Sequence, residues 1–513
     1  MMLCGIDAPF ECLPAPLPIW RAPVTIEQWL GAARAVHSDA GRLLALWGSD
    51  TRARQGGFSV CAAYVVAQGL VCLVLPLYSE RYPDLSAIFP AAARMQRAIS
   101  DLLGLEADGG GDHRPWLRHS AWPRDYFPLR AESSGQESFS PMAREDYAFV
   151  AVEGEGVHEI AVGPVHAGII EPGHFRFSVV GEKVLRLEER LGYTHKGVEK
   201  LFEHTPPLQG YRLAGRIAGD STVAYAWAYA MALESAARIP LAEPDAWARA
   251  LLLERERVAN HLGDLGALGN DAGFAFGLSQ FSMLRETWLR LNQQLFGHRF
   301  LMDCIVPGGS AFTLERAGRA LLLRQCDQLE IQLARLHAIY DEHAGLQDRF
   351  MNTGRVAPHL AAELGLCGMA GRASAQSHDL RVDQPCQPYN QLGVRIATHH
   401  EGDVSARVSI RFDEISESLR LIREICHRLP PITPSPAVEL SELNGSGIGC
   451  VEGWRGEVLI ALDLWHGNIQ RCHCHDPSWQ NWPVVEHAII GNIVADFPLI
   501  NKSFNLCYSG HDL

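Results

Sequence analysis

The stretch LAGRIAGDSTVAYAWAYAMALESAARIP, residues 213–240, decides the fold of this chain. Between Thr222 and Ala237 it places Ala, Val, Tyr, Trp, Met and Leu on every helical face, with one charged side chain, Glu234. A helix that is apolar all round is a buried helix, so we predict a central helix whose single acid is paired or lies near the end of the buried part. Pro240 predicts where the helix stops. Its first turn should face whatever the core contains.

Length and composition set the broad class. With 513 residues, 47% of them hydrophobic, the chain should hold two or more domains and a large core. The formal charge of -14 argues against a nucleic-acid or anionic-lipid surface as the main partner. Thirteen scattered cysteines suit reduced thiols. No apolar run spans a bilayer and no signal peptide is visible, so we expect a cytoplasmic protein.

The pattern along the chain predicts an α+β protein. Residues 1–130 read as a small α/β domain, in which two β-rich runs separated by Gln-Gly predict a hairpin within 58–77. Residues 131–150 are polar and Ser-rich, as in a linker. Residues 151–513 begin with a β-meander at 174–193 and continue mainly as helix. Helical periodicity follows in 243–268, 280–300, 313–346 and 404–428.

The central stretch resembles the first metal-ligand motif of nickel-iron hydrogenase large subunits, in which R-x-C-G-x-C leads into a helix. Arg216, Gly219 and Glu234 match that motif, whereas its two cysteines fall on Ala218 and Ser221. Its second ligand pair, D-P-C-x-x-C, is similar to the end of this chain, where Cys507 and Gly510 take the cysteine positions. One thiol therefore stands where the family has four. Since neither a methyl group nor a neutral hydroxyl replaces a thiolate, no nickel-iron centre is expected.

A second resemblance covers the N-terminal part. RYPDLSAIFPAAARMQRAISDLLG, residues 81–104, is similar to the Y-P-x-L-x-x-I-F-P segment of the C subunit of respiratory complex I. Fused C-like and D-like parts occur in some complex I subunits and in group 4, energy-converting hydrogenases of the formate-hydrogenlyase type. This resemblance implies a complex I C-subunit-like domain at 1–130 and a hydrogenase-large-subunit or D-subunit-like domain at 151–513.

The resemblance also implies site residues. His166 and Glu171 lie in a G-P-x-H…E-P-G-H-F-R loop, where they are expected to exchange protons with an acceptor, although a solvated loop is the alternative. Tyr229 is expected to donate a hydrogen bond to a quinone. Asp271 falls on the acidic position that partners the quinone-binding histidine of complex I. Arg372 corresponds to the arginine beside the iron ligands of hydrogenases.

These resemblances imply an electron-transfer subunit of a membrane-associated complex-I-like complex, peripheral on the cytoplasmic face of the cell membrane. Its partners would be membrane-arm subunits and a small iron-sulfur subunit, docked near YTHKGVEK, residues 193–200. The cavity would take a quinone or another two-electron acceptor, with no covalently bound cofactor. Two alternatives remain open: a non-catalytic scaffold that holds the iron-sulfur subunit on the membrane arm, and a working hydrogenase whose metal is held by other residues.

One local cluster lies outside these motifs. Cys472, His473, Cys474 and His475 follow one another directly, which raises the hypothesis of a structural zinc site. In a strand, however, the two cysteines share one face and the two histidines the other. No second pair of zinc-binding residues lies nearby in the sequence, so the cluster by itself does not establish a site.

Overall fold

The computed structural model describes residues 2–54, 56–140, 142, 146–165, 171–436, 438, 440 and 444–513. Its first part is built on a five-stranded sheet in the order β3-β4-β7-β6-β5, in which β4 and β7 are parallel and the other neighbours antiparallel. The strands are β3 (Glu11–Cys12), β4 (Ile19–Pro23), β5 (Arg42–Asp50), β6 (Phe58–Val66) and β7 (Gly69–Leu77). The predicted hairpin is confirmed, because β6 and β7 are antiparallel neighbours and their pairing extends to Val66 and Gly69 at the turn.

Two helices accompany this sheet, α1 (Ile26–Ser38) and α2 (Ala92–Leu103). The Thr25 hydroxyl accepts a hydrogen bond from the Gln28 backbone amide, and Gln28 Oε1 accepts one from the Thr25 backbone amide, so a capping box begins α1. Helix α2 ends at Gly104, whose φ of +71° stops it. Two short pairs complete this part: β1 (Met2–Leu3) with β2 (Ile6–Asp7), and β8 (Arg81–Pro83) with β9 (Glu106–Asp108).

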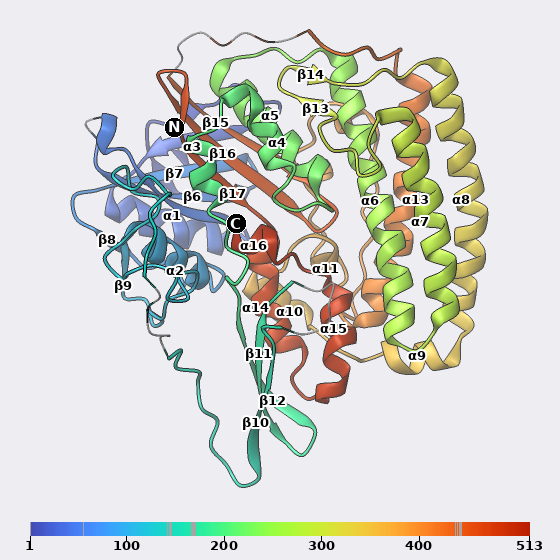
Figure 1. The fold of residues 1–513 in the computed structure, drawn as a ribbon, viewed down its shortest axis with the longest axis horizontal. Helices are drawn as coiled ribbons and strands as arrows, with labels where there is room; N and C mark the ends of the chain where they lie inside the picture. Colours follow the sequence, from blue (N-terminus) through green and yellow to red (C-terminus); the bar gives the residue numbers. More distant parts are fainter. Residues whose placement is uncertain are drawn as a thin grey trace.

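A three-stranded antiparallel arm follows, made of β10 (Val157–Val162), β11 (His174–Val180) and β12 (Lys183–Arg190). It projects from the body of the molecule in Figure 1. The predicted meander of β11 and β12 is confirmed. The turn between β11 and β12 is bridged from Lys183 to Ile493, which precedes helix α15 (Phe497–Phe504).

The predicted central helix is α5 (Thr222–Ala237), and its side chains are buried from Thr222 to Ser235. Glu234 is paired with the fully buried Arg249, with a shortest N–O distance of 2.6 Å. The helix packs on β15 (Gly445–Glu452), whose Gly445, Gly447 and Gly449 are spaced two apart and face one side. A Cβ on these glycines would lie 2.0–2.6 Å from α5 carbonyl oxygens, so only glycine permits this approach. The strand continues into β16 (Glu457–Trp465) and β17 (Asn468–His475).

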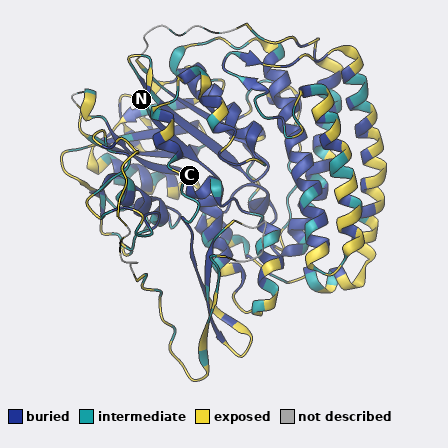
Figure 2. Ribbon diagram, in the orientation of Figure 1, coloured by how far each residue is buried: buried dark blue, intermediate teal, exposed yellow. Residues whose placement is uncertain are grey.

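Four long helices stand side by side at one end of the molecule (Figure 1): α6 (Glu243–Asp271), α7 (Ala275–Phe296), α8 (Arg316–Glu342) and α13 (Val404–Arg428). The outer helices α7 and α8 show exposed outward faces in Figure 2, whereas α6 is buried over most of its length. Several predicted boundaries were wrong: α6 continues past residue 268 to Asp271, α7 ends at Phe296 before residue 300, and α8 begins at Arg316 after residue 313. Helix α7 begins at Ala275, before residue 280, and α8 ends at Glu342, after which α9 (Ala344–Phe350) is a separate helix capped by His343.

Shorter elements connect these parts. They are α3 (Val198–Glu203), α4 (Gly210–Ala214), β13 (Ile305–Val306), β14 (Gly309–Ser310), α10 (Pro358–Leu364), α11 (Gly368–Arg372), α12 (Leu380–Asp383), α14 (Ser478–Ala488) and α16 (Ser509–Asp512). The C-terminal segment returns to the centre of the molecule, where Asp512 accepts hydrogen bonds from the amides of Gly192 and Thr194. In the described part of the chain, no helix has both the length and the apolar character to cross a membrane.

Candidate functional site

A cavity of about 600 Å³ lies between the loop that leads into α5 and the C-terminal segment. Its walls come from five regions far apart in the sequence: Glu171 before β11, the α5 loop, the end of α6, the β15–β16 turn and residues 498–509. Charged and polar side chains make up much of the lining. The lining residues are Glu171, Gly219, Asp220, Asp271, Arg455, Pro498, Asn501, Lys502, Asn505, Leu506, Cys507, Tyr508 and Ser509.

The two predicted ligand motifs therefore meet in space. Gly219 and Asp220 lie between Ala218 and Ser221, and they share the cavity wall with Cys507. Ala218 is buried, and the Ser221 hydroxyl accepts hydrogen bonds from Trp454 Nε1 at 3.1 Å and Arg455 Nη1 at 3.3 Å. The first motif thus presents a methyl group and a hydroxyl that is already engaged.

Cys507 is held rigidly by its surroundings. Its amide donates to Ser478 Oγ at 2.9 Å, its carbonyl accepts from Trp482 Nε1 at 3.1 Å, and its Sγ accepts from the Gly510 amide at 3.1 Å. Burial, and then the nearby Asp476 carboxylate, raise the pKa of this thiol well above its ordinary value. The sulfur is therefore a neutral thiol at physiological pH, which is a poor nucleophile and a poor metal ligand.

Gly510, at the second cysteine position of that motif, has no room for a side chain. A Cβ there would lie 2.4 Å from Asp476 Oδ2 and 2.8 Å from the Tyr225 hydroxyl oxygen. These two groups hydrogen-bond each other at 2.7 Å, with Tyr225 donating. The Tyr225–Asp476 pair therefore occupies the space that a fourth ligand would need.

An ion pair joins the two sides of the cavity. Arg455 Nη2 and Nη1 contact the Asp220 carboxylate at 2.6 and 3.0 Å, and Nε donates to the Asn505 carbonyl. Burial raises the pKa of Asp220, but the Arg455 guanidinium outweighs this effect and the net pKa is lowered. Arg455 thereby ties the α5 loop to the C-terminal segment.

Two of the predicted site residues lie on this cavity. Glu171 accepts a hydrogen bond from the Ser509 amide at 3.0 Å, and Asp271 lies at the C-terminal end of α6. Burial raises the pKa of Asp271. A carboxyl group with a raised pKa can carry a proton close to neutral pH. His166, the third predicted proton carrier, lies outside the described residues.

Tyr229 lies away from the described cavity wall, and its predicted hydrogen bond to a quinone remains a prediction. Its hydroxyl donates to the Pro207 carbonyl at 2.7 Å, its ring stacks on Phe202, and it is not part of the cavity wall. Tyr225, one helical turn earlier, is the tyrosine of α5 that lies beside the second ligand motif. A hydroxyl that is buried and already paired at Tyr229 has no free donor for an acceptor molecule.

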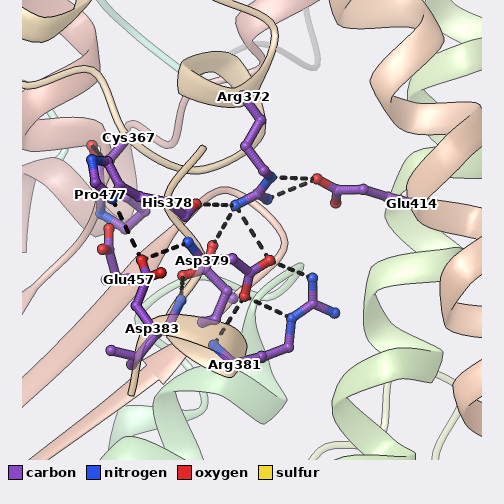
Figure 3. A network of polar contacts seen from close by, with 12 residues as sticks. Cys367, Arg372, His378, Asp379, Arg381, Asp383, Glu414, Glu457 and Pro477 are labelled. Atoms are coloured by element: carbon purple, nitrogen blue, oxygen red, sulfur yellow. Dashed lines mark hydrogen bonds and ion pairs between the residues drawn. The ribbon is translucent and has the colours of Figure 1, made fainter. Parts of the chain in front are cut away.

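Arg372 also lies away from the cavity. Its side chain is 1% exposed and contacts Glu414 at 2.7 Å and Glu452 at 3.0 Å, inside a network of buried ion pairs (Figure 3). Its correspondence to the arginine beside the iron ligands of hydrogenases remains a prediction. Sequence reasoning gave no role to Asp220 and Lys502, which do line the cavity. Arg455 lies in the stretch EGWRGE, residues 452–457, and also lines the cavity without a role predicted from the sequence.

The Cys472–His475 run follows the alternation of strand β17. The two cysteine sulfurs lie 4.0 Å apart, whereas His473 Nδ1 contacts Glu199 Oε1 at 2.7 Å and His475 Nε2 contacts Gln480 Oε1 at 2.9 Å. Within the described ranges, no group of three or more His, Cys, Asp or Glu side chains has a metal-binding arrangement. These polar groups tie β17 to its neighbours.

Most side chains of the stretch predicted to dock a small subunit, residues 193–200, make contacts within this chain. Thr194 Oγ1 donates to Asp512, His195 Nδ1 contacts the Asp512 carbonyl, and Lys200 pairs with Glu203. Lys196 is the exposed cation of this stretch. The segment therefore holds the C-terminal residues in place and presents one positive charge outward.

Two family models match the chain. The respiratory-chain NADH dehydrogenase 30-kDa subunit matches residues 22–138 and the 49-kDa subunit matches residues 271–442. The chain is 28% identical over 491 residues to formate hydrogenlyase subunit 5 of Escherichia coli (strain K12), covering 93% of this chain and 85% of that protein. It is 29% identical over 486 residues to hydrogenase-4 component G of the same strain, covering 92% and 84%.

A solved structure shares the fold. A chain in the structure of the membrane-bound sulfane sulfur reductase (MBS), an archaeal respiratory membrane complex, matches with a TM-score of 0.66 at 24% identity, over 70% of this chain and 99% of that one. The predicted resemblances and the α+β fold class are confirmed. The chain thus joins domains of the 30-kDa and 49-kDa respiratory-chain NADH dehydrogenase types in one polypeptide, homologous to formate hydrogenlyase subunit 5 and hydrogenase-4 component G.

Proposed function

We propose that the chain is the acceptor-reducing subunit of a membrane-associated, complex-I-like oxidoreductase complex, and that its cavity binds a quinone or another two-electron acceptor without a nickel-iron centre. The observation that carries this proposal is that Asp220 and Cys507 line the same cavity. The two segments that hold the metal ligands in nickel-iron hydrogenases therefore still enclose a pocket, although three of the four ligand cysteines are absent. A cavity of about 600 Å³ has the size of an ordinary small-molecule site.

The residues present do not fit a binuclear nickel-iron centre. Of the four ligand positions, Ala218 has no donor atom, Ser221 is engaged by Trp454 and Arg455, and Gly510 is closed off by Asp476. Cys507 alone carries sulfur, and its raised pKa keeps it protonated. A soft metal centre needs several deprotonated thiolates, so this pocket serves another purpose.

In this function the chain's own groups bind the acceptor and handle protons. The Arg455–Asp220 pair fixes the two sides of the cavity, and Lys502 supplies a further positive charge. Asp271, whose pKa burial raises, and Glu171 are the proton carriers on the described wall, with His166 as the third. Electrons would come from an iron-sulfur cluster in a small partner subunit, and membrane-arm subunits would anchor the complex at the cytoplasmic face of the membrane.

The test uses the complex purified from its native host. Asp271→Asn should lower acceptor-dependent turnover about tenfold or more, in line with removal of a general acid. Tyr229→Phe, a matched control outside the cavity, should leave turnover unchanged. If both variants retain full turnover, the subunit is a scaffold. Stoichiometric nickel and iron in the purified wild-type subunit would instead restore the hydrogenase alternative.

A further inference from the structure

A cluster of charged side chains is buried inside the molecule, and none of its members belongs to the cavity wall. It joins α6, α11, α12, α13 and the end of β15, and Figure 3 shows Arg372 at its centre, pointing toward Glu414 on one side and the 378–381 loop on the other. Each member is 5% exposed or less. The members of this buried ion cluster are Glu254, Arg257, Arg372, Asp379, Arg381, Glu414 and Glu452.

The cluster is connected by short contacts. Arg381 Nη2 lies 2.6 Å from Asp379 Oδ2, and Arg381 Nη1 lies 3.0 Å from Glu254 Oε1. Arg372 bridges Glu414 at 2.7 Å and Glu452 at 3.0 Å. Arg257 contacts Glu414 at 3.3 Å, so every guanidinium has at least one carboxylate.

The charges of the cluster do not balance. Three guanidinium groups face four carboxyl groups, all buried. The neighbouring pair of Arg42 and Glu457, on β5 and β16, is neutral as a unit. His261 lies 2.8 Å from Glu414, but burial lowers its pKa and keeps its imidazole neutral. Full ionisation would leave one uncompensated negative charge in the interior, which is unfavourable enough that a proton should bind instead.

The contacts indicate which carboxyl group takes that proton. Glu254 accepts from the Tyr389 and Ser418 hydroxyls besides Arg381, and Glu414 contacts Arg372, Arg257 and His261. Asp379 has a two-pronged contact with Arg381. Glu452 accepts one bond from Arg372 and one, at 3.1 Å, from the Leu380 amide.

Glu452 is therefore the least stabilised anion of the four. We propose that Glu452 is the proton-binding site of this cluster and that it carries one buried, exchangeable proton at neutral pH. Burial, and then the negative charge of Asp379, raise the pKa of Glu452 to about 8, in agreement with the contacts. The charged groups that act on it are Arg257 from α6, Arg372 from α11, Asp379 before α12, Glu457 from β16 and Arg42 from β5, and Glu254 and Glu414 complete the cluster around these arginines.

The stored proton lies close to the cavity along the chain. Arg257 holds the carbonyl groups of Glu452 and Gly453 at 2.8 and 3.2 Å, and the same turn carries Arg455, the partner of Asp220. Ionised Glu452 would add a buried negative charge to the turn that carries Arg455, and this charge would oppose the arrival of electrons in the cavity. This functional link, unlike the protonation itself, rests on the proposed acceptor reduction.

Infrared spectroscopy of the full chain at neutral pH tests the protonation directly, through the carbonyl stretch of protonated carboxyl groups and its shift in heavy water. Glu452→Gln should remove one component of this band. Glu286→Gln, which removes an ion-paired carboxylate outside the cluster and leaves the cluster's charge balance intact, should leave the band unchanged. An unchanged band in Glu452→Gln would overturn the proposal.

A second variant keeps the test decisive if Glu452→Gln does not fold. Asp379→Asn leaves three carboxyl groups for three guanidinium groups, so Glu452 should ionise and the same component should disappear; its persistence would overturn the proposal. In the complex, turnover of the wild type should fall as the pH rises through about 8, and that of Glu452→Gln should not. A wild-type complex that reduces no acceptor would refute the proposed function, while the infrared result would still decide the protonation.

Discussion

The Tyr225 hydroxyl donates a hydrogen bond to the Asp476 carboxylate at 2.7 Å, and this pair fills the space in front of Gly510. A glycine in place of a cysteine is one difference from the family motif, and the filling of the space beside that glycine by other side chains is a second one. A substituted ligand can be restored by one reverse mutation. A position that neighbouring side chains have filled needs those neighbours to change as well.

Restoring the cysteine alone should therefore fail. Gly510→Cys places Cβ 2.4 Å from Asp476 Oδ2, and we expect a loss of about 1–3 kcal/mol in unfolding free energy, the usual range for overpacking. Thermal unfolding of the purified chain measures this loss. Adding Asp476→Ala should recover part of it by making room. A Gly510→Cys variant as stable as the wild type would show that the space is not closed.

The glycines of β15 should be irreplaceable where they meet α5. In Gly447→Ala the new Cβ would lie 2.0 Å from the Ala232 carbonyl oxygen, a backbone atom of a buried helix that cannot turn aside. We expect destabilisation of about 3 kcal/mol, the upper end of the overpacking range. Gly111→Ala is the matched control, because no atom lies within 4 Å of its Cβ. Equal midpoints for both variants in denaturant unfolding would contradict the close packing of strand on helix.

The pH dependence of stability should report on Glu256. This carboxyl group is buried in α6 and accepts hydrogen bonds from the Val223 and Ala224 amides at the start of α5. Burial raises its pKa from 4.5 to about 8, so the folded state binds a proton that the unfolded state releases between these values. The associated stability is fully present below pH 4.5 and is lost as the pH rises through about 8.

Comparison of variants isolates this contribution. Glu256→Gln should remove a decline on the order of 4 kcal/mol between pH 5 and 9, since each pKa unit corresponds to about 1.4 kcal/mol. Unfolding free energies measured across that range give the result. Glu234→Gln, at the other end of α5, should leave this pH-dependent decline in unfolding free energy in place. Parallel curves for wild type and Glu256→Gln would mean that this carboxyl group is ionised in the folded chain.

Local patterns in the sequence predicted the helix α5, the hairpin of β6 and β7 and the meander of β11 and β12, because each depends on residues that are neighbours along the chain. The sequence could not show which tyrosine of α5 lies beside the second ligand motif, because Tyr225 and Tyr229 are four residues apart and share one face of the helix. The position of each hydroxyl depends on its hydrogen-bond acceptor, Asp476 for Tyr225 and Pro207 for Tyr229, and both acceptors are distant in sequence.

The partners of Arg372 raise the same difficulty. Glu414 lies 42 residues away and Glu452 lies 80 residues away, and no local pattern pairs them. A family motif indicates that an arginine is needed at Arg372, whereas the contacts that it makes depend on the packing of three separate elements. The four ligand positions could be predicted because the motifs fix their spacing in the sequence. The lack of space for a side chain at Gly510 could not, because it depends on the position of Asp476.

The ion pair across the cavity gives the last prediction. Arg455 is 5% exposed and Asp220 is 37% exposed in their side chains, so the pair is screened by solvent on one side only. Removing one partner of a buried pair costs about 3–5 kcal/mol of unfolding free energy, and this exposure should reduce the loss in Arg455→Gln to about 1–3 kcal/mol.

Asp220→Asn in the Arg455→Gln background should recover part of the loss, since it neutralises the carboxylate left without its partner. A double-mutant cycle by thermal unfolding measures the coupling. A coupling energy of zero would mean that Arg455 stabilises the turn through Asn505 and the Trp454 ring alone.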